Sequence, residues 1–459
     1  MDISNRNTID LKDKKIVVIG LGLSGYAAAK LAIHCGAHVL ISDPSQSDIV
    51  KSRGEELSEI GISVELGSYT DNIYDADLWI LSPGVPKNEP IVTHALVKKI
   101  TIVGEIEFAS WFTESPIIAV TGSNGKTTTV NILTAMCQTD STHGVLAGNV
   151  GSAFSKNVLD EIENPDPNQV YILEISSFQM EFIQHFHPNI SVFLNITPDH
   201  LDRHGSMADY TSSKMNMCQN QGKSDTIIYN GDDPILTERL NNVSSQIKIF
   251  GFNENSEYSF RINAANIYDK SKNIYIKIDE IALPGPHNVA NLTAAAMAAK
   301  TIGIPDDQIQ HVFRSFQAIQ HRLENVATIS GIDFINDSKA TNVDAVKVAL
   351  QSYTQPIILI LGGKDKGGDF TQLLPHTHNV KAVLAYGQAR DIIATALEDA
   401  VRLSLVEGLK DAVRLSHQLA SSGDIVLLSP GCASFDQFTS YEERGDMFKK
   451  WANELEQIA

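Results

Sequence analysis

Cysteine is scarce in this chain, with four residues among 459. Cys35, Cys137, Cys218 and Cys432 lie far apart and form no C-x-x-C pair, which argues against a disulfide scaffold and a cysteine-rich zinc site. Such sparse cysteine usage fits a reducing compartment, so we expect a cytoplasmic protein.

Long apolar runs and excess positive charge are also missing. The polar start MDISNRNTIDLKDKK has no apolar core for a signal peptide, and no run reaches the ~20 apolar residues of a membrane helix. Lys and Arg number 36 against 55 Asp and Glu, a net charge of −19. Because nucleic acids are bound through excess Lys and Arg, we expect no nucleic-acid partner. The missing apolar runs lead us to expect neither export nor membrane insertion.

What is present is alternation of strand and helix patterns. Apolar strands such as KKIVVIG alternate with helical segments, and the alternation restarts at Pro116 and again after the segment IQHRLE. This pattern is typical of βαβ units with parallel sheets, and the length suits roughly three domains of ~150 residues. We therefore predict three consecutive α/β units.

The first unit carries a glycine-rich loop. Gly20, Gly22 and Gly25 follow a strand in G-x-G-x-x-G spacing, and Asp43 ends the next strand, 18 residues after Gly25. Such a loop cradles a diphosphate, and the acidic residue fits the dinucleotide fingerprint. Taken alone, the pattern leaves a nicotinamide-linked dehydrogenase open.

A second glycine-rich loop, TGSNGKTTT, follows the strand IIAV and leads into a helix. Gly122 and Gly125 let the backbone N–H groups turn toward phosphate oxygens, Lys126 adds a mobile charge, and Thr127 offers a hydroxyl to the Mg²⁺ that accompanies ATP. Val120 stands where the generic phosphate-loop motif has its first glycine. The alternative is a Gly/Ser turn followed by a surface lysine.

Two further residues are candidate metal ligands. Glu174 in YILEISSFQ and His200 in LNITPDHLDRH each follow a buried-looking strand, and we expect them at adjacent strand ends. They could hold Mg²⁺, although histidine is an unusual ligand for this ion. The alternatives are a strand-end carboxylate without a metal, and a zinc site at His200, Asp202 and His204, whose spacing matches no common ligand pattern.

The blocks GSNGKTT, GNVG, LEISSFQ, TPDHLDRH, PGPHNVAN, QHRLE, NDSKATN, LGGKDKGGDF and LSPGCASFDQF occur in this order. Together they resemble the Mur ligases, and the last four resemble the members that add D-glutamate. The resemblance implies an N-terminal Rossmann-like domain for UDP (1–104), a central P-loop ATPase-like α/β domain with a mainly parallel sheet (105–318), and a C-terminal Rossmann-like domain for the amino acid (319–459).

The activity implied by the resemblance is ATP-dependent ligation in peptidoglycan precursor synthesis. The γ-phosphoryl group of ATP activates the L-alanine carboxylate of UDP-N-acetylmuramoyl-L-alanine as an acyl phosphate, which the amine of D-glutamate attacks. We expect a monomer whose partners are these three small molecules. A sibling ligase adding another amino acid and a folate polyglutamylase stay open beside the dehydrogenase.

The resemblance also implies a catalytic centre. Lys126, His200, Lys214 and Arg322 would be catalytic, with Thr127, Glu174, His200 and Lys214 around two Mg²⁺ ions. Lys214 fits a cation site only as a carbamate formed with CO₂; its alternative is a solvated lysine just past a helix start. The implied ATP-binding set is Gly122, Ser123, Asn124, Gly125, Lys126, Thr127, Thr128, Asn288, Asn291, Arg322 and Asp337. Asn288 and Asn291, one turn apart on an Ala-rich helix, have a capping or surface role as their alternative.

Two substrate sites complete what the resemblance implies. The UDP-substrate site would comprise Gly22, Leu23, Ser24, Asp43, Ser82, Gly84 and Asn149, and the D-glutamate site Lys339, Thr341, Lys366, Ser434, Phe435 and Tyr441. The chain departs from the family pattern in two places. Pro44 and Ser45 replace a Thr-Arg pair, and Tyr441 replaces a phenylalanine.

Overall fold

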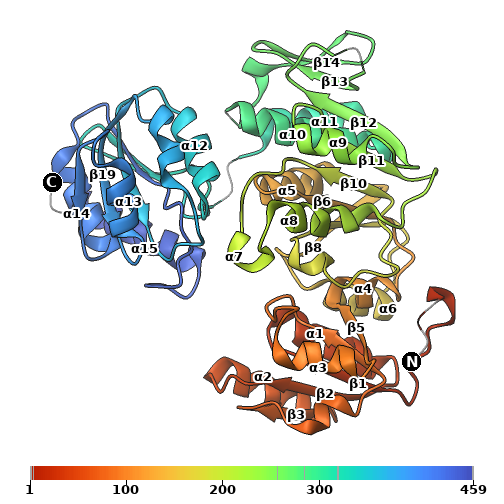
Figure 1. Ribbon diagram of the computed structural model, residues 1–459. Coiled ribbons are helices and arrows are strands. Elements are labelled where there is room, and N and C mark those ends of the chain that lie inside the picture. Colours follow the sequence, from red (N-terminus) through yellow and green to blue (C-terminus); the bar gives the residue numbers. More distant parts are fainter. Residues whose placement is uncertain (1–2, 4, 256, 284, 318–319, 457–459) are drawn as a thin grey trace. The chain divides into compact units, whose positions relative to one another are not determined.

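The computed structural model describes residues 3, 5–255, 257–283, 285–317 and 320–456, without the side chains of Asn7, Asp202 and Glu456. It contains three β-sheets with helices on their faces (Figure 1). The chain divides into two compact units, and each is described on its own. The first comprises Met1–Ile196, Ala208–Glu280 and Ala290–Arg314, and the second Thr197–Met207, Ile281–Val289 and Ser315–Ala459.

The N-terminal sheet is five-stranded and parallel, in the order β3-β2-β1-β4-β5. Strand order reverses at β1, so the loops after β1 and β4 border the crevice in which open α/β sheets bind ligands. The elements are β1 Lys15–Ile19, α1 Leu23–His34, β2 His38–Asp43, α2 Asp48–Glu59, β3 Ser63–Leu66, β4 Leu78–Leu81, α3 Pro90–Val97, β5 Thr101–Gly104 and α4 Glu105–Ser110.

The central sheet is ten-stranded, with β6 between β9 and β10. It is parallel from β8 to β13, whereas β7, β14 and β15 pair antiparallel at its two edges. The elements are β6 Ile117–Thr121, α5 Lys126–Met136, β7 Gln138–Thr139, β8 Thr142–Gly148, α6 Phe154–Glu163, β9 Gln169–Glu174, β10 Ile190–Phe193, α7 Leu201–His204, α8 Met207–Met215, β11 Thr226–Asn230, α9 Pro234–Leu240, β12 Gln246–Gly251, β13 Phe260–Ile262, β14 Asn266–Asp269, β15 Ile274–Lys277, α10 Pro286–Thr301 and α11 Asp306–Ser315. Of these, α7 belongs to the second unit, as do the start of α8 at Met207, the start of α10 through Val289 and the end of α11 at Ser315.

The C-terminal sheet is six-stranded, in the order β16-β17-β21-β18-β19-β20, and only β16 runs antiparallel to its neighbour. The elements are β16 Glu324–Ile329, β17 Ile332–Asn336, α12 Val343–Gln351, β18 Ile357–Gly362, β19 Val380–Tyr386, α13 Arg390–Leu397, β20 Leu403–Leu405, α14 Leu409–Leu419, β21 Ile425–Leu428 and α15 Tyr441–Glu456. Short 3₁₀ helices along the chain are Arg6–Thr8, Asp71–Tyr74, Phe178–Met180, Asn216–Cys218, Ile278–Glu280 and Phe370–His376.

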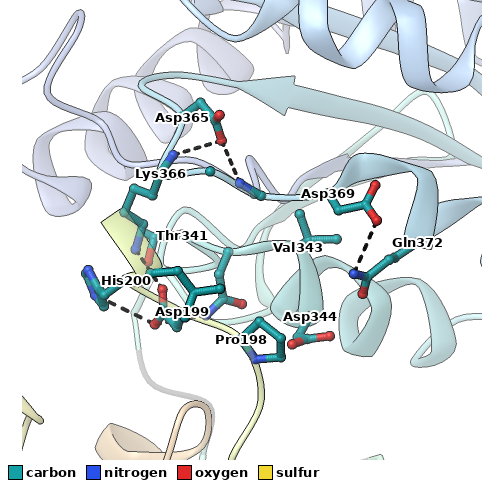
Figure 2. A pocket seen from close by; sticks show the side chains of 15 residues that line it. Pro198, Asp199, His200, Thr341, Val343, Asp344, Asp365, Lys366, Asp369 and Gln372 are labelled. Atoms are coloured by element: carbon teal, nitrogen blue, oxygen red, sulfur yellow. Dashed lines mark hydrogen bonds and ion pairs between the residues drawn. The ribbon is translucent and has the colours of Figure 1, made fainter. Parts of the chain in front are cut away.

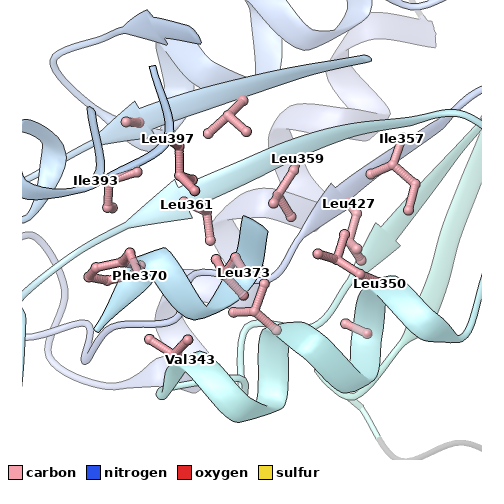
Figure 3. Packing of buried hydrophobic residues seen from close by; sticks show 14 of the residues in the cluster. Val343, Leu350, Ile357, Leu359, Leu361, Phe370, Leu373, Ile393, Leu397 and Leu427 are labelled. Carbon is pink, nitrogen blue, oxygen red and sulfur yellow. The ribbon is translucent and has the colours of Figure 1, made fainter. Parts of the chain in front are cut away.

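Helices cover both faces of this third sheet, and the alternation along β18 shows why. Leu359 and Leu361 belong to one buried cluster, whereas Ile358 and Ile360 belong to another. Successive strand residues point to opposite faces, so an apolar run such as IILILG needs cover on both. Figure 3 shows the first cluster, where the strand side chains meet those of α12 and α13.

The predicted fold class is confirmed: three sheet-containing α/β parts with mostly parallel sheets follow one another along the chain. The boundary predicted between residues 104 and 105 stays a prediction, and the one between residues 318 and 319 lies outside the described residues. None of the described helices has the length and apolarity needed to cross a membrane.

Candidate functional site

The second glycine-rich loop has the predicted strand–loop–helix setting. It leaves the fully buried β6 and enters α5 at Lys126, with Gly125 in the left-handed conformation at φ +87°. The Lys126 ammonium donates to the carbonyls of Gly122 at 2.7 Å and Ser123 at 2.9 Å. A Cβ at Gly125 would lie 2.4 Å from the Asn291 side-chain oxygen. Only glycine therefore fits this turn.

Three polar side chains meet beside the loop. The Thr127 hydroxyl donates to Glu174 Oε2 at 2.6 Å, and the Asn149 amide donates to Glu174 Oε1 at 2.8 Å. Glu174 ends β9 as predicted and is buried. A hydroxyl and a carboxylate oxygen side by side are the donors that Mg²⁺ prefers, so this pair fits the ion.

Lys214 lies against the same loop. It is 2% exposed, and its ammonium donates to the Gly122 carbonyl at 2.9 Å and to Thr121 Oγ1 at 3.4 Å. The ammonium also lies 4.7 Å from the Tyr210 ring centroid. Lys214 stands in the last turn of α8 rather than just past its start, and the solvated-lysine alternative is wrong because the side chain is buried.

The expectation that Glu174 and His200 lie at adjacent strand ends is wrong. Their strands β9 and β10 flank β6, which lies between them. His200 comes seven residues after β10 ends, in the left-handed conformation at φ +53°, and belongs to the second unit. No group of three or more His, Cys, Asp or Glu in the described part of the chain gathers as a metal site, but this search does not test the zinc alternative at His200, Asp202 and His204. The Asp202 side chain is outside the described residues.

Asn288 and Asn291 lie inside α10 and are 5% and 6% exposed. The surface alternative is wrong, because both residues are buried, whereas the capping alternative stays a prediction for Asn288, the third residue of α10. Asn291 approaches Gly125, whereas Asn288 falls in the second unit.

The N-terminal loop is held mainly by backbone and by Asp43. The Asp43 carboxylate accepts from the Leu21 N–H at 2.6 Å and from the Ser45 N–H at 2.7 Å. Ser82 Oγ donates to the Gly20 carbonyl at 3.0 Å. A Cβ at Gly22 or Gly84 would meet no atom within 4 Å. We call the surface formed by Gly22, Leu23, Ser24, Ser82 and Gly84 the ledge. In it, Leu23 is 67% exposed and Ser24 is partly buried.

Arg322 and Asp337 are the predicted ATP-binding residues of the second unit that follow α11. Burial raises the pKa of Asp337 to about 6, against the opposing effect of the Arg322 guanidinium. Asp337 accepts from Ser429 Oγ at 2.9 Å. The buried Arg322 Nε has no hydrogen-bond partner among the described residues. A buried orphan donor on a cation is what an anionic ligand oxygen would satisfy.

A cavity of about 200 Å³ in the second unit contains part of the predicted amino-acid site. Thr341 and Lys366 line it, and Lys366 forms an ion pair of 3.1 Å with Asp199 (Figure 2). Its size suits a single amino acid better than a drug-sized ligand, whose pockets begin at roughly 300 Å³. The predicted residues that do not line it are Lys339, Ser434, Phe435 and Tyr441.

Those four residues lie elsewhere in the second unit. The Lys339 ammonium is 5.1 Å from the Tyr441 ring centroid. Ser434 is buried, whereas Phe435 is 68% exposed. The structure therefore gathers Thr341 and Lys366 with His200 around one cavity, and leaves the other predicted contacts outside it.

Comparison with known proteins shows which family this chain belongs to. The chain matches the Mur ligase MurD-like N-terminal domain over residues 14–104, the Mur ligase middle domain over 120–299 and the Mur ligase glutamate ligase domain over 321–432. A Pelotomaculum thermopropionicum protein named UDP-N-acetylmuramoylalanine--D-glutamate ligase is 39% identical over 448 residues, with 96% of this chain and 98% of the relative covered. The chain belongs to the Mur ligase family.

Other Mur ligases extend the comparison. An Acidobacterium capsulatum protein with the same printed name is 40% identical, with 96% of each chain covered. The solved structure of MurF ligase from Thermotoga maritima in complex with ADP superposes with a TM-score of 0.62 at 15% identity, covering 99% of this chain and 98% of that one. MurC from the same organism gives 0.60 at 19% identity, covering 97% and 99%. At such identities the two structures bear on the fold alone, which is that of a Mur ligase.

Sequence reasoning about this Mur ligase missed several residues that shape the two sites. Asn195 accepts from and donates to the backbone of Asn124 at 2.8 and 3.0 Å. Asp199 and Asn342 line the amino-acid cavity. Asp199 occurs in the block TPDHLDRH and Asn342 in the block NDSKATN. Each is a polar residue adjacent to a predicted ligand, and this position could have marked it as a site residue.

Proposed function

We propose that this Mur ligase joins D-glutamate to UDP-N-acetylmuramoyl-L-alanine at the expense of ATP, in peptidoglycan precursor synthesis. The observation that carries the proposal is the Lys126 loop with its Thr127–Glu174 pair, in a chain whose relatives are named for this reaction. The dehydrogenase alternative would leave both Lys126 and the amino-acid cavity without a role.

The chemistry begins with the uphill joining of a carboxylate to an amine. Transfer of the γ-phosphoryl group to the L-alanine carboxylate gives an acyl phosphate, and attack by the D-glutamate amine then releases phosphate through a tetrahedral intermediate. Phosphoryl transfer depends mainly on positioning and charge neutralisation. Lys126 and the loop N–H groups would hold the phosphates, and the Arg322 Nε–H would donate to an oxygen of the transferred group.

Mg²⁺, when bound, neutralises phosphate charge and orients the transferred oxygens. Thr127 and Glu174 would hold one ion, since their oxygens already lie 2.6 Å apart. His200 and Lys214 are the candidates for a second ion. A bare ammonium repels a cation, so Lys214 serves only as an anionic carbamate formed with CO₂. Its burial against the Gly122 carbonyl puts the nitrogen beside the phosphate loop, which supports this role.

The remaining contacts with ATP follow from position. Asn291 beside Gly125, with Asn288 one turn earlier, would hold the adenine. Asp337 would accept a hydrogen bond from the ribose. Ser123, Asn124 and Thr128 contribute the rest of the loop.

The amino acid enters the Lys366 cavity. Lys366 would pair with the side-chain carboxylate of D-glutamate, and Thr341 would donate to the molecule from the same lining. Lys339, Ser434, Phe435 and Tyr441 stay proposed contacts of lower rank, because they do not line this cavity. The ledge at Gly22, Leu23, Ser24, Ser82 and Gly84 would take the diphosphate and uridine, while Asn149 would meet the muramoyl-alanine part.

Asp43 would support the N-terminal loop from below, since its two oxygens accept the Leu21 and Ser45 N–H groups, and it stays a proposed contact of the UDP substrate. We also propose a cytoplasmic monomer. Four cysteines without a disulfide suit a reducing compartment. Sedimentation of the purified chain measures its oligomeric state.

The test is phosphate release from ATP with Mg²⁺ and UDP-N-acetylmuramoyl-L-alanine, comparing D-glutamate with L-glutamate, L-lysine and diaminopimelate. D-glutamate alone should support turnover. Turnover with one of the other three would assign the chain to a sibling ligase. A spectral change with NAD(P)H and no phosphate release would overturn the ligase assignment altogether.

A further inference from the structure

The amino-acid cavity carries more negative than positive charge, although it is proposed to take a dicarboxylate. Asp199, Asp344, Asp365 and Asp369 line it, with Lys366 as the lysine of the lining (Figure 2). The aspartates would repel the carboxylate of an incoming substrate, unless the Lys366 ammonium leaves its present partner and pairs with that carboxylate. The question is which of the four carboxylates engages that lysine.

Three of the aspartates serve local structure. Asp365 accepts from the N–H groups of Lys366 and Gly368, which shapes its own turn. Asp369 accepts from the Thr371 N–H as the cap of the following 3₁₀ helix. Asp344 pairs with Lys347 at 2.7 Å, on the same helix. None of these contacts involves the Lys366 ammonium.

Asp199 is the carboxylate that holds Lys366. The two charged atoms are 3.1 Å apart, and the side chains are 10% and 17% exposed, so water screens the pair poorly. The other Asp199 oxygen accepts from the Asn342 amide at 3.3 Å and lies 3.7 Å from His200 Nε2. If Lys366 turned to another acid, Asp199 would keep these neighbours and would not become an isolated buried charge.

We propose that Asp199 is a placeholder for the side-chain carboxylate of D-glutamate on Lys366. The proposal rests on the proposed function and deepens it. Binding is an exchange of one carboxylate for another: the Asp199–Lys366 pair opens, the incoming carboxylate takes the ammonium, and Asn342 and His200 retain Asp199. The pair keeps the lysine in position for substrate, and its opening subtracts from the affinity for D-glutamate. Asp199 is thus a positioning residue.

The proposal predicts a gain of affinity from a loss of charge. With an ATP analogue and UDP-N-acetylmuramoyl-L-alanine present, Asp199→Asn should bind D-glutamate about five- to tenfold more tightly than the wild type, since no pair must open. The KM for D-glutamate should fall in the same sense. A merely structural Asp199 would lower kcat and leave KM unchanged or raised.

Asp344→Asn is the matched control, because it removes one negative charge from the same lining without touching Lys366. It should change D-glutamate affinity less than about twofold. In a Lys366→Met background, Asp199→Asn should have no further effect, because the partner it competes for is gone. ATP-analogue affinity checks that each variant is folded.

Equal or weaker D-glutamate binding by Asp199→Asn would overturn the placeholder role, as would an equal gain from Asp344→Asn. Either result leaves the ligase assignment standing if the wild type turns over. A wild type that binds and uses no D-glutamate would overturn both proposals, and it is visible without any variant.

Discussion

The loops at Gly20–Ser24 and Gly122–Thr127 both follow a buried strand, are rich in glycine and begin a helix, yet their surroundings differ. The N-terminal loop contains no Lys or Arg and is held by Asp43, whose carboxylate accepts the Leu21 N–H. Arg53 donates to the Leu21 carbonyl of the N-terminal loop at 3.2 Å, whereas the central loop carries its own lysine and also accepts from the Lys214 ammonium. A phosphate that is merely held needs N–H groups and space, whereas a phosphate that reacts needs cations placed around it.

The sharpest way to break this comparison is to remove the central cation. Lys126→Met should lower phosphate release about a thousandfold, because the charge that develops on the transferred group loses its stabilising partner. UDP binding at the N-terminal loop should stay unchanged, and calorimetry with UDP measures it. Residual activity within tenfold of the wild type would mean that Lys126 is only structural.

Lys214→Ala should have the next largest effect. We expect phosphate release to fall about a hundredfold or more, because the buried position beside Gly122 would lose its anionic ligand. Short carboxylic acids should partly restore the variant by supplying the missing carboxylate. Mass spectrometry of native protein in bicarbonate should find one added CO₂ on Lys214. Undiminished activity would refute the role.

The local structure of the Lys126 loop could be predicted from the sequence, whereas its contacts with distant segments could not. The strand–loop–helix setting of Lys126 could be predicted, because it depends on residues adjacent in the chain. The approach of Asn291 to Gly125 and the burial of Lys214 could not be derived from local pattern, because both depend on segments brought together by the sheet. Family resemblance named these residues without giving their contacts.

The same limit applies to the amino-acid cavity. Lys366 was predicted as a cation for a carboxylate, but its pairing with Asp199 joins positions 167 residues apart. No periodicity or spacing encodes such a pair. The order of the strands could not be predicted either. We expected β9 and β10 side by side, yet β6 lies between them. Strands that are consecutive in the chain need not be neighbours in a parallel sheet.

Two glycines of the N-terminal loop sharpen the comparison further. A Cβ at Gly25 would lie 1.9 Å from the Gly20 carbonyl oxygen, whereas a Cβ at Gly22 meets no atom within 4 Å. Gly25→Ala should therefore push α1 off the loop, costing ~1–3 kcal/mol of stability and about tenfold in UDP affinity. Gly22→Ala should stay within ~0.5 kcal/mol. Thermal unfolding and UDP calorimetry measure both; equal losses would mean that the ledge is not open at Gly22.

The smallest expected effect concerns pH and Asp337, whose pKa burial raises from 3.8 to about 6. Between these values the folded chain holds a proton that the unfolded chain has released, so the Asp337 contribution to the unfolding free energy declines as pH rises from about 4 to about 6. Asp337→Asn should lack this decline. For ATP the sign is opposite, because a ribose hydroxyl donates better to the carboxylate than to its protonated form.

Affinity for an ATP analogue should thus weaken severalfold as pH falls from 7 to 5 in the wild type, and Asp337→Asn should bind weakly with little pH dependence over this range. Asp333→Asn is the control, since Asp333 lies on β17, the strand that Asp337 directly follows, and accepts from Thr328 instead. A pH profile of Asp337→Asn parallel to that of the wild type would assign the titration to another group. Phosphate ionisation of the nucleotide affects all three proteins equally, so only the difference between their profiles reports on Asp337.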